Sequence, residues 1–429
     1  MSNIALRMEG DEMTDWSVWH SEKAGRVQPS VISEMMYLVK ERKALSFTAG
    51  EPSVDLFPLD GLKEAFNKAF SDPSVLSYHP DNAGLKELRE WIVQWMAEDK
   101  LLPPWVSAGN VILTNGSQEG VNLIAEALIN PGDVIMTESP SYPEAMGTFK
   151  KEGARFAPVP VDKDGPDLNA MEGVLQRERV KCFYTIVNFQ NPTGCTTSDD
   201  RKARVLELAK SHGFFIIEDD PYRNLRLEGE PTDSYIRMAG SDDRVIYLGS
   251  FSKILAPGLR CGWLVAPSPL SSKLVELRVS IEISLSALVQ RAVYEFLKCT
   301  DLKSHLESLR SVYRKRRDAL VSALREHAVP LGMRFDVPKG GFFLWGEIPG
   351  VENIYELAKF AILEEGVGFI PGKPFYPDGA GPEGSMRLSY AKVSPEEAKE
   401  GAVRLSRAIQ KFREMEVALS QRGLAQLRK

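Results

Sequence analysis

The chain has 429 residues, of which 43% are hydrophobic and 26% are charged, a balance usual for a globular protein of two or three domains. Its formal net charge of -6 excludes the broad basic surface expected of a protein that binds nucleic acid or anionic lipid. The four cysteines form no C-x-x-C pair and the five histidines do not pair at metal-ligand spacing, so we expect neither a disulfide framework nor a metal site.

No segment of the sequence has the pattern that directs a chain to a membrane. The N-terminus lacks an apolar stretch behind a basic start, and no run approaches the roughly 18 apolar residues of a membrane span. We therefore expect no secretion signal and a reducing, cytoplasmic location.

The first two thirds of the chain predict an α/β fold. An amphipathic helix is expected over 30–41, and from about residue 60 to 300 short apolar runs alternate with amphipathic helical segments. Such alternation is typical of a mostly parallel sheet covered by helices on both faces. The expected strands are 111–114, 134–136, 182–187, 214–217, 245–248 and 262–265, with helices such as 119–128 and 201–210 between them.

After residue 300 the pattern changes to that of a smaller α+β domain. We expect helices over 302–327, 354–365 and from 395 onward, strands at 341–345, 367–370 and 386–390, and a loop over 371–384. The predicted division is an N-terminal arm and helix (1–46) packing with the small domain, a large domain (47–300) and a small C-terminal domain (301–429).

Polar residues follow several of the expected strands, and in an open α/β sheet ligands bind at the carboxyl ends of strands. Ser117 and Gln118 open a helix whose free N–H groups favour an anion, although a plain helix cap gives the same pattern. Tyr142 could stack on a planar ring, although packing is its commoner role.

Two further strand ends carry candidate residues. Asn191 lies in Asn-Pro-Thr-Gly, which is also an ordinary turn sequence. Asp219 and Tyr222 lie in Glu-Asp-Asp-Pro-Tyr; an acid that ends an apolar run is costly without a cation, and a protonated pyridine nitrogen would supply one.

The segment Ser250-Phe251-Ser252-Lys253, with Arg260 seven positions later, is the most informative motif. A lysine at the mouth of a sheet suits an amine that attacks a carbonyl, and the two serines and the arginine suit an anion. Taken alone, a lysine beside serines is as often a solvated loop. Together with the other strand ends, the motif predicts pyridoxal phosphate as cofactor.

These motifs resemble those of the fold-type-I pyridoxal-phosphate-dependent aminotransferases of class I/II, over nearly the whole chain from Phe47 to Tyr390. The forms of 116–118 and 218–222 are most similar to the kynurenine/2-aminoadipate aminotransferase branch. The resemblance implies a mostly parallel sheet of the seven-stranded type in a three-layer α/β/α cofactor domain, beside the smaller α+β domain. It also implies a homodimer with shared active sites, in which Tyr78 reaches the cofactor phosphate of the partner subunit.

The resemblance further implies a role for each candidate residue. Lys253 would bind the cofactor covalently and move a proton, and Asp219 would keep the pyridine nitrogen protonated. Arg387 would clamp the substrate α-carboxylate, a bidentate task suited to guanidinium. Asn191 and Tyr222 would hold the phenolic oxygen, Tyr142 would stack on the ring, Ser117, Gln118, Ser250, Ser252 and Arg260 would bind phosphate, and Gly50 and Asn191 would contact substrate.

The implied activity is transfer of the amino group of an L-amino acid (aromatic, 2-aminoadipate or long aliphatic) to a 2-oxo acid, with 2-oxoglutarate expected, by a ping-pong mechanism in amino acid metabolism. A β-lyase or decarboxylase on the same fold is the alternative, because the site and not the fold sets the chemistry. A cofactor-sensing regulator would need a DNA-binding module, and no helix-turn-helix pattern precedes Gly50. Selectivity for the side chain is expected from the N-terminal helix, the loop region 282–287 and the neighbouring subunit, with Trp16, Trp19 and Phe57 as candidate lining residues.

Overall fold

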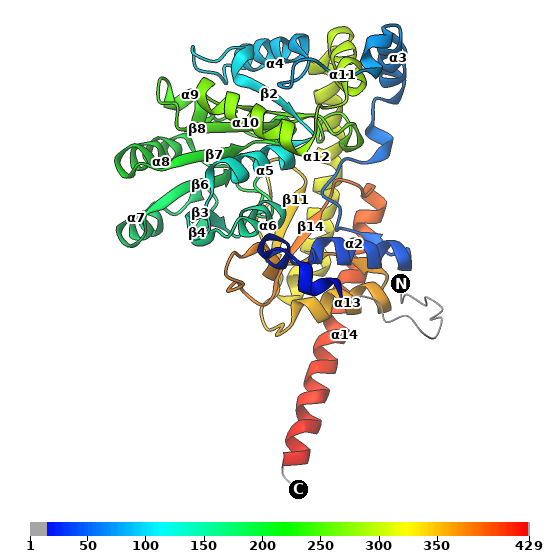
Figure 1. The fold of residues 1–429 in the computed structure, drawn as a ribbon. Coiled ribbons are helices and arrows are strands. Elements are labelled where there is room, and N and C mark those ends of the chain that lie inside the picture. Colours follow the sequence, from blue (N-terminus) through cyan, green and yellow to red (C-terminus); the bar gives the residue numbers. More distant parts are fainter. Residues whose placement is uncertain (1–14, 428–429) are drawn as a thin grey trace, which may run out of the picture.

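The computed structural model describes residues 15–427, and a sheet of eight strands forms the centre of the larger part of the molecule (Figure 1). Helices α5 (Ser117–Leu128), α6 (Pro143–Lys151) and α10 (Ser268–Ile281) pack as one group, and α7 (Leu168–Arg177), α8 (Asp199–His212) and α9 (Tyr235–Ala239) as another. The strand order is β2 (Val111–Thr114), β9 (Gly262–Val265), β8 (Val245–Ser250), β7 (Phe215–Asp219), β6 (Val180–Ile186), β3 (Val134–Ser139), β4 (Arg155–Asp162) and β5 (Gly165–Pro166).

The middle of this sheet is parallel. Strands β8, β7, β6, β3 and β4 pair in parallel, and β9 is antiparallel to both of its neighbours. Apart from β4, these strands are buried along nearly their whole length, which explains why they are continuous apolar runs in the sequence. The fold class expected from the sequence is confirmed, with the two-residue β5 added to the seven longer strands.

Strand β4 is the one long strand of this sheet that the sequence analysis did not predict. It contains Pro158 and Pro160, which lack a backbone N–H and so oppose the prediction of a strand. Both prolines lie where β4 pairs with β3 alone, since β5 reaches only Val161 and Asp162. Prolines are tolerated at such an edge because no ladder hydrogen bond is required there.

The smaller part of the molecule contains a four-stranded antiparallel sheet and three long helices. The sheet order is β10 (Arg334–Phe335), β11 (Phe343–Glu347), β14 (Ser385–Ser389) and β13 (Ile370–Pro371). The helices are α12 (Leu302–His327), α13 (Ile354–Glu364) and α14 (Pro395–Leu427), of which α14 runs beyond the body of the molecule (Figure 1).

The prediction of a single strand over 367–370 is wrong, because this segment forms two short strands that belong to different sheets. β12 (Val367–Gly368) pairs in parallel with β1 (Leu45–Ser46), whereas β13 joins β14. Helix α2 (Val31–Arg42) packs against α13 and β12 beside this pair. The division of the chain at residues 46 and 300 stays a prediction.

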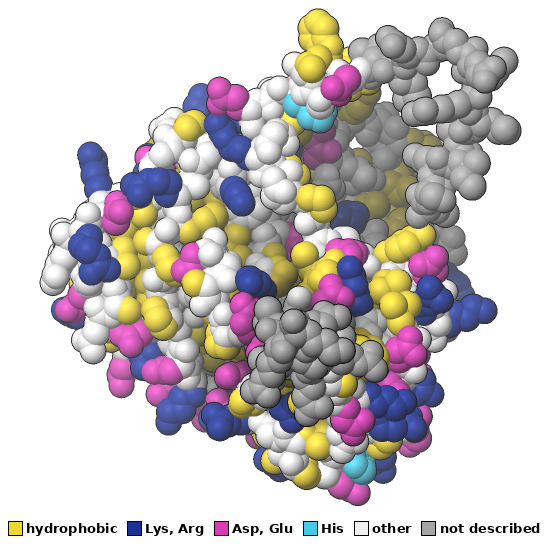
Figure 2. All heavy atoms as spheres, turned by 90° about the horizontal axis from the view of Figure 1, so that it is seen from below, with side chains coloured by type: hydrophobic (Ala, Val, Ile, Leu, Met, Phe, Trp, Pro, Cys, Tyr) yellow, Lys and Arg dark blue, Asp and Glu magenta, His cyan; other side chains and the backbone are white. Residues whose placement is uncertain are grey.

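The surface is of mixed charge. Lys and Arg side chains are interspersed with Asp and Glu over the face shown in Figure 2, as suits a net charge of -6. Within residues 15–427, no helix combines the length and the apolar character needed to cross a membrane.

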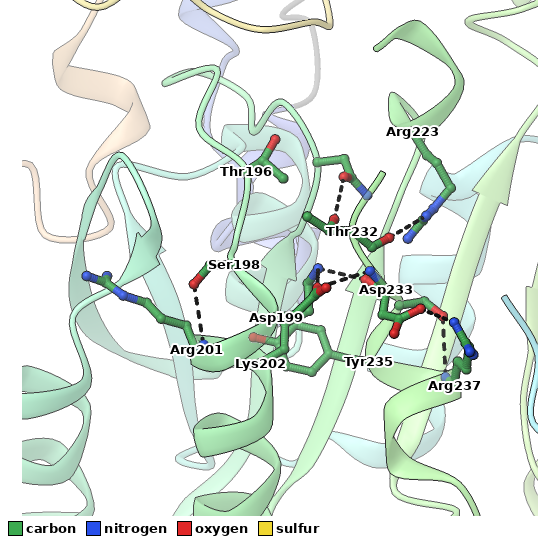
Figure 3. A network of polar contacts seen from close by, with 12 residues as sticks. Thr196, Ser198, Asp199, Arg201, Lys202, Arg223, Thr232, Asp233, Tyr235 and Arg237 are labelled. Atoms are coloured by element: carbon green, nitrogen blue, oxygen red, sulfur yellow. Dashed lines mark hydrogen bonds and ion pairs between the residues drawn. The ribbon is translucent and has the colours of Figure 1, made fainter. Parts of the chain in front are cut away.

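An ionic network around the buried Lys202 holds α8 against the segment that leads into α9 (Figure 3). Lys202 is fully buried and its Nζ donates to Asp199 Oδ1 at 3.2 Å and to the Asp233 carbonyl at 2.7 Å. The Asp233 N–H donates to the same Asp199 oxygen at 3.0 Å. Burial lowers the pKa of Lys202, while Glu218 and Asp199 oppose that shift.

Candidate active site

A cavity of about 280 Å³, here called the inner pocket, lies at the carboxyl ends of β6, β7 and β8. Its floor comes from the large sheet, and its other walls come from α2, β11 and β14, since Ile32, Met36, Phe343 and Arg387 also line it. The inner pocket brings together eight residues that the sequence singled out: Gly50, Ser117, Tyr142, Asn191, Asp219, Tyr222, Lys253 and Arg387.

Lys253 lies three residues beyond the end of β8, and its side chain is partly buried in the inner pocket. Its Nζ donates to the Gly50 carbonyl at 2.8 Å and lies 5.8 Å from the centroid of the Tyr222 ring. Burial lowers the pKa of Lys253 to about 8, with Arg387 and Arg260 acting in the same direction and Glu51 and Asp219 against it. This amine therefore loses its proton more readily than an ordinary lysine.

Strand alternation decides which acid of Glu218-Asp219-Asp220 faces the inner pocket. Glu218 points the other way and accepts the N–H groups of Tyr235 and Ile236 at the start of α9, at 2.9 and 3.0 Å. Asp220 accepts from Arg223 Nε at 2.6 Å and from an asparagine amide at 2.8 Å. Of the three acids, only Asp219 lines the inner pocket.

Asp219 has one oxygen engaged and one free. Its Oδ2 accepts from the Tyr184 hydroxyl at 2.8 Å, whereas its Oδ1 is buried and has no hydrogen-bond partner among the described residues 15–427. Burial raises the pKa of Asp219 to about 7, against the lowering effect of the Tyr184 bond. An unpartnered buried carboxylate oxygen is costly, so a ligand with an N–H donor fits this position.

Arg387 brings a buried positive charge to the opposite wall. Its Nη1 donates to Asn191 Oδ1 at 3.0 Å and its Nη2 to the Thr48 carbonyl at 2.8 Å, while Nε is buried and unpartnered. The guanidinium carbon lies 4.3 Å from the centroid of the Phe343 ring. Burial lowers the pKa of Arg387 to about 10. Since the partners of Arg387 are uncharged oxygens, its charge suits an incoming carboxylate.

The start of α5 and Arg260 form a cradle for an anion beside the inner pocket. Arg260 Nη2 donates to the Asn115 carbonyl at 2.6 Å, and a side chain at Gly116 would approach this nitrogen to 2.9 Å. Gly116 has φ +82°, which favours glycine, and it precedes the free N–H groups of the helix. Ser250 and Ser252 are buried behind Lys253, where the Ser252 N–H donates to Ser250 Oγ at 3.1 Å, and neither lines the inner pocket.

Gln118 and the three aromatic candidates for side-chain selectivity do not line the inner pocket. The Gln118 side chain turns away from the inner pocket, because its amide donates to Thr148 Oγ1 at 2.7 Å and to the Glu144 carbonyl at 3.2 Å on α6. One residue along a helix rotates the side chain by about 100°, so Ser117 and Gln118 cannot share a direction. Trp16 and Trp19, which are 71% and 74% exposed, and Phe57 line neither this cavity nor the one described below.

Tyr78 lies outside the inner pocket of its own chain and is 74% exposed. This position is compatible with the predicted contact of Tyr78 with the cofactor of a second subunit. That role stays a prediction.

The sequence analysis missed three residues at the site: Tyr184, Glu51 and Glu144. Tyr184 lies within β6, where its sequence position indicated only core packing, yet its hydroxyl holds Asp219. Glu51 lines the inner pocket and forms an ion pair with Lys392. Glu144 follows Tyr142 in the first turn of α6, where an acid indicates no more than a helix start.

The residues of the inner pocket fit pyridoxal phosphate. The unpartnered Asp219 Oδ1 suits the protonated ring nitrogen, and Lys253 suits the aldehyde. The cradle at the start of α5 suits the phosphate, and Tyr142 borders the space between these groups. Pyridoxal phosphate therefore explains all of these features together. Ordinary turns and helix caps would explain each motif separately but give no reason for the motifs to meet in one cavity.

Comparisons with known proteins give the same assignment. The family described as aminotransferase class I and II matches residues 42–405. The chain is 37% identical to a 2-aminoadipate transaminase of Thermus thermophilus, over 92% of this chain and 97% of that protein. It is 34% identical to an aromatic-amino-acid aminotransferase of Thermococcus litoralis, over 92% and 95%.

A solved structure also matches over nearly the full length. The α-aminoadipate aminotransferase of Thermus thermophilus, complexed with N-(5'-phosphopyridoxyl)-L-leucine, superposes with a TM-score of 0.86 at 36% identity, covering 94% of this chain and all of that one. The fold, the family match and the inner pocket of this chain therefore support one assignment. The chain belongs to the class I and II aminotransferases and is a pyridoxal-phosphate-dependent aminotransferase of fold type I.

Proposed function

We propose that the protein transfers the amino group of an L-amino acid with an aromatic, 2-aminoadipate-like or long aliphatic side chain to a 2-oxo acid, with 2-oxoglutarate as the expected acceptor, in two half-reactions. The donor classes rest on similarity to the 2-aminoadipate and aromatic-amino-acid enzymes. The observation that carries the proposal is one cavity holding a lysine of lowered pKa, an acid with an unpartnered oxygen and an arginine without an acidic partner.

Each proposed role follows from a contact. Arg387 binds the substrate α-carboxylate, and Asn191 holds the guanidinium in place through the bond at 3.0 Å. Gly50, whose carbonyl accepts a hydrogen bond from Lys253, also lines the inner pocket and is proposed to contact the substrate. Lys253, as a neutral amine, accepts the proton that leaves the Cα of the donor amino acid and, in the second half-reaction, donates a proton to the Cα of the amino acid formed from the acceptor. When bound, pyridoxal phosphate supplies a ring that withdraws electrons from this Cα.

The remaining residues position the cofactor. Asp219, ionised and held by Tyr184, keeps the proton on the ring nitrogen, and Tyr142 packs on the ring. Asn191 and Tyr222 are proposed to hold the phenolic oxygen. The phosphate is assigned to Arg260, Ser117, Ser250, Ser252 and the backbone N–H of Gln118, whose side chain is engaged on α6.

We also propose a cytoplasmic homodimer with shared sites that acts in amino acid metabolism. The exposure of Tyr78 outside its own inner pocket supports the shared site. All four cysteines, each within the described residues, are free thiols, which suits a reducing compartment.

Incubation of the loaded enzyme with an amino acid alone tests the reaction type. A transaminase stops after one equivalent of 2-oxo acid per site, because no acceptor is present to restore the cofactor. Continuous release of ammonia, sulfide or carbon dioxide would instead identify a β-lyase or a decarboxylase. Adding 2-oxoglutarate and then other 2-oxo acids identifies the acceptor.

A further inference from the structure

A second cavity of about 590 Å³, here called the outer chamber, adjoins the inner pocket. The two cavities share Ile32, Tyr142 and Glu144 as lining residues, so these side chains form the junction between them. The outer chamber lies between segment 26–32, α6 and segment 374–377. Much of its lining is apolar: Val27, Pro29, Val31, Met146, Phe156 and Pro374.

Glu144 is the acidic group at this junction, and only one of its oxygens has a partner. Its Oε1 accepts from Ser30 Oγ at 3.1 Å, at the N-cap of α2, while Oε2 is buried and finds no hydrogen-bond partner in the part of the chain that the structure describes. Burial raises the pKa values of Tyr142 and Tyr222 and lowers that of Arg387; the negative charge of Glu144 adds to the first two shifts and opposes the third, so it acts on the inner pocket. A buried unpartnered oxygen favours a ligand that brings a donor.

Most of the other charged groups around the two cavities have partners or face the reacting end of the substrate. In the inner pocket, Arg387 and Lys253 face the reacting end of the substrate, and Glu51 is paired with Lys392. In the outer chamber, Arg26 is paired with Glu22 at 2.8 Å and Lys151 donates to Asn122 at 2.6 Å. Lys150 is exposed. A side chain that extends from the inner pocket therefore meets the carboxylate of Glu144 before it meets any cation of the outer chamber.

We propose that the outer chamber is a side-chain subsite for long amino acids whose side chains carry a cationic or neutral hydrogen-bond donor, and that Glu144 selects them by accepting from that donor. This inference rests on the proposed transamination. It narrows the donor classes, because a side-chain carboxylate such as that of 2-aminoadipate would face the negative charge of Glu144.

A matched set of unbranched donors tests the inference: L-lysine, L-6-hydroxynorleucine, L-norleucine and L-2-aminoadipate. The donor half-reaction of the holoenzyme is followed by the absorbance of the bound cofactor, which requires no acceptor. Binding of the α-methyl analogues is measured by calorimetry, because they lack the Cα proton and cannot be transaminated. We expect lysine and 6-hydroxynorleucine to bind about tenfold or more tightly than 2-aminoadipate, as for a hydrogen bond to a charged group.

Two variants separate the charge of Glu144 from its contact with Ser30. Glu144→Gln keeps a side-chain oxygen for Ser30 and removes the charge, so it should reduce the preference for lysine over 2-aminoadipate about tenfold. Ser30→Ala removes the contact and keeps the charge, so it should leave that preference within about twofold. An unchanged preference in Glu144→Gln, or an equal loss in Ser30→Ala, would overturn the inference.

The two proposals fail in different ways. If the holoenzyme converts no amino acid of this set while the α-methyl analogues bind in the expected order, the substrate subsite stands and the proposed transamination of these donors does not. If transamination proceeds but 2-aminoadipate is the tightest ligand and Glu144→Gln weakens it, the proposed reaction stands and the role of Glu144 is refuted.

Discussion

Two lysines of the large sheet region, Lys202 and Lys253, have pKa values lowered by burial, yet their surroundings prepare them for different tasks. Lys202 is fully buried and bonded to the Asp199 carboxylate and the Asp233 carbonyl (Figure 3). Within residues 15–427, Lys253 has the Gly50 carbonyl as its one hydrogen-bond partner, and its side chain lines the inner pocket. Burial alone does not make an amine reactive; a cavity and the absence of a bonded carboxylate do.

The carboxylates Glu218 and Asp219 show the same contrast. Burial raises the pKa of each to about 7. Glu218 is held by two N–H groups of α9, whereas Asp219 has one oxygen without a partner. A perturbed pKa is therefore shared by structural and functional groups, and the unpartnered atom beside a cavity distinguishes the functional one.

Of the substitutions considered, replacement of Lys253 should have the largest effect on activity. We expect Lys253→Ala to reduce transamination at least about 1000-fold, because the amine that moves the Cα proton is lost. Its thermal unfolding should change little, since Lys253 holds no ion pair within its site. Steady-state assays and calorimetric melting of the same preparation check both parts, and a variant that retains substantial turnover would remove Lys253 from its role.

Arg387→Lys should weaken substrate binding roughly 100-fold, because lysine cannot replace the planar fork that is fixed by Asn191 and Thr48. The effect should appear in KM for the amino acid more than in kcat. Arg226→Lys is a suitable control, since Arg226 bonds Asn188 and lies outside the inner pocket. A similar rise in KM in both variants would contradict a specific role for Arg387.

Attachment of the cofactor to Lys253 should depend on pH with a midpoint near 8. Only the neutral amine attacks the aldehyde, so the rate should rise about 50-fold from pH 6 to pH 8 and level off above that. Mixing cofactor-free protein with pyridoxal phosphate and following absorbance at each pH measures this rate. A rise that continued about tenfold per pH unit to pH 10 would indicate an ordinary lysine.

Lys202→Met should have the smallest effect on catalysis and a clear effect on stability. The substitution leaves Asp199 and the Asp233 carbonyl without their buried partner, at a cost of about 1–3 kcal/mol in the free energy of unfolding. Urea denaturation measures that loss, and kcat should be unchanged. Lys210→Met, on the exposed face of the same helix, serves as control and should change the free energy of unfolding by less than about 0.5 kcal/mol.

Much of the fold and of the site was predictable from local patterns. The strands at 111–114 and 262–265 and the helix over 302–327 have the predicted bounds, because buried apolar runs and amphipathic periods are local signals. Strand β4 could not be predicted in this way, because its prolines are tolerated only at the edge of the sheet, and that position is known only from the whole fold.

The sequence by itself determined which polar residues follow which strands, and hence that Lys253, Asp219 and Asn191 reach one edge of the sheet with Arg387 expected to join them. Only the tertiary structure decided the direction of each side chain. Alternation in β7 assigns Asp219 and not Glu218 to the inner pocket, and helix rotation removes Gln118 from it. The contact of Glu144 with Ser30 joins residues 114 positions apart, and no local pattern encodes such a distance. Local periodicity fixes elements, whereas packing between distant segments fixes which atoms are left without partners.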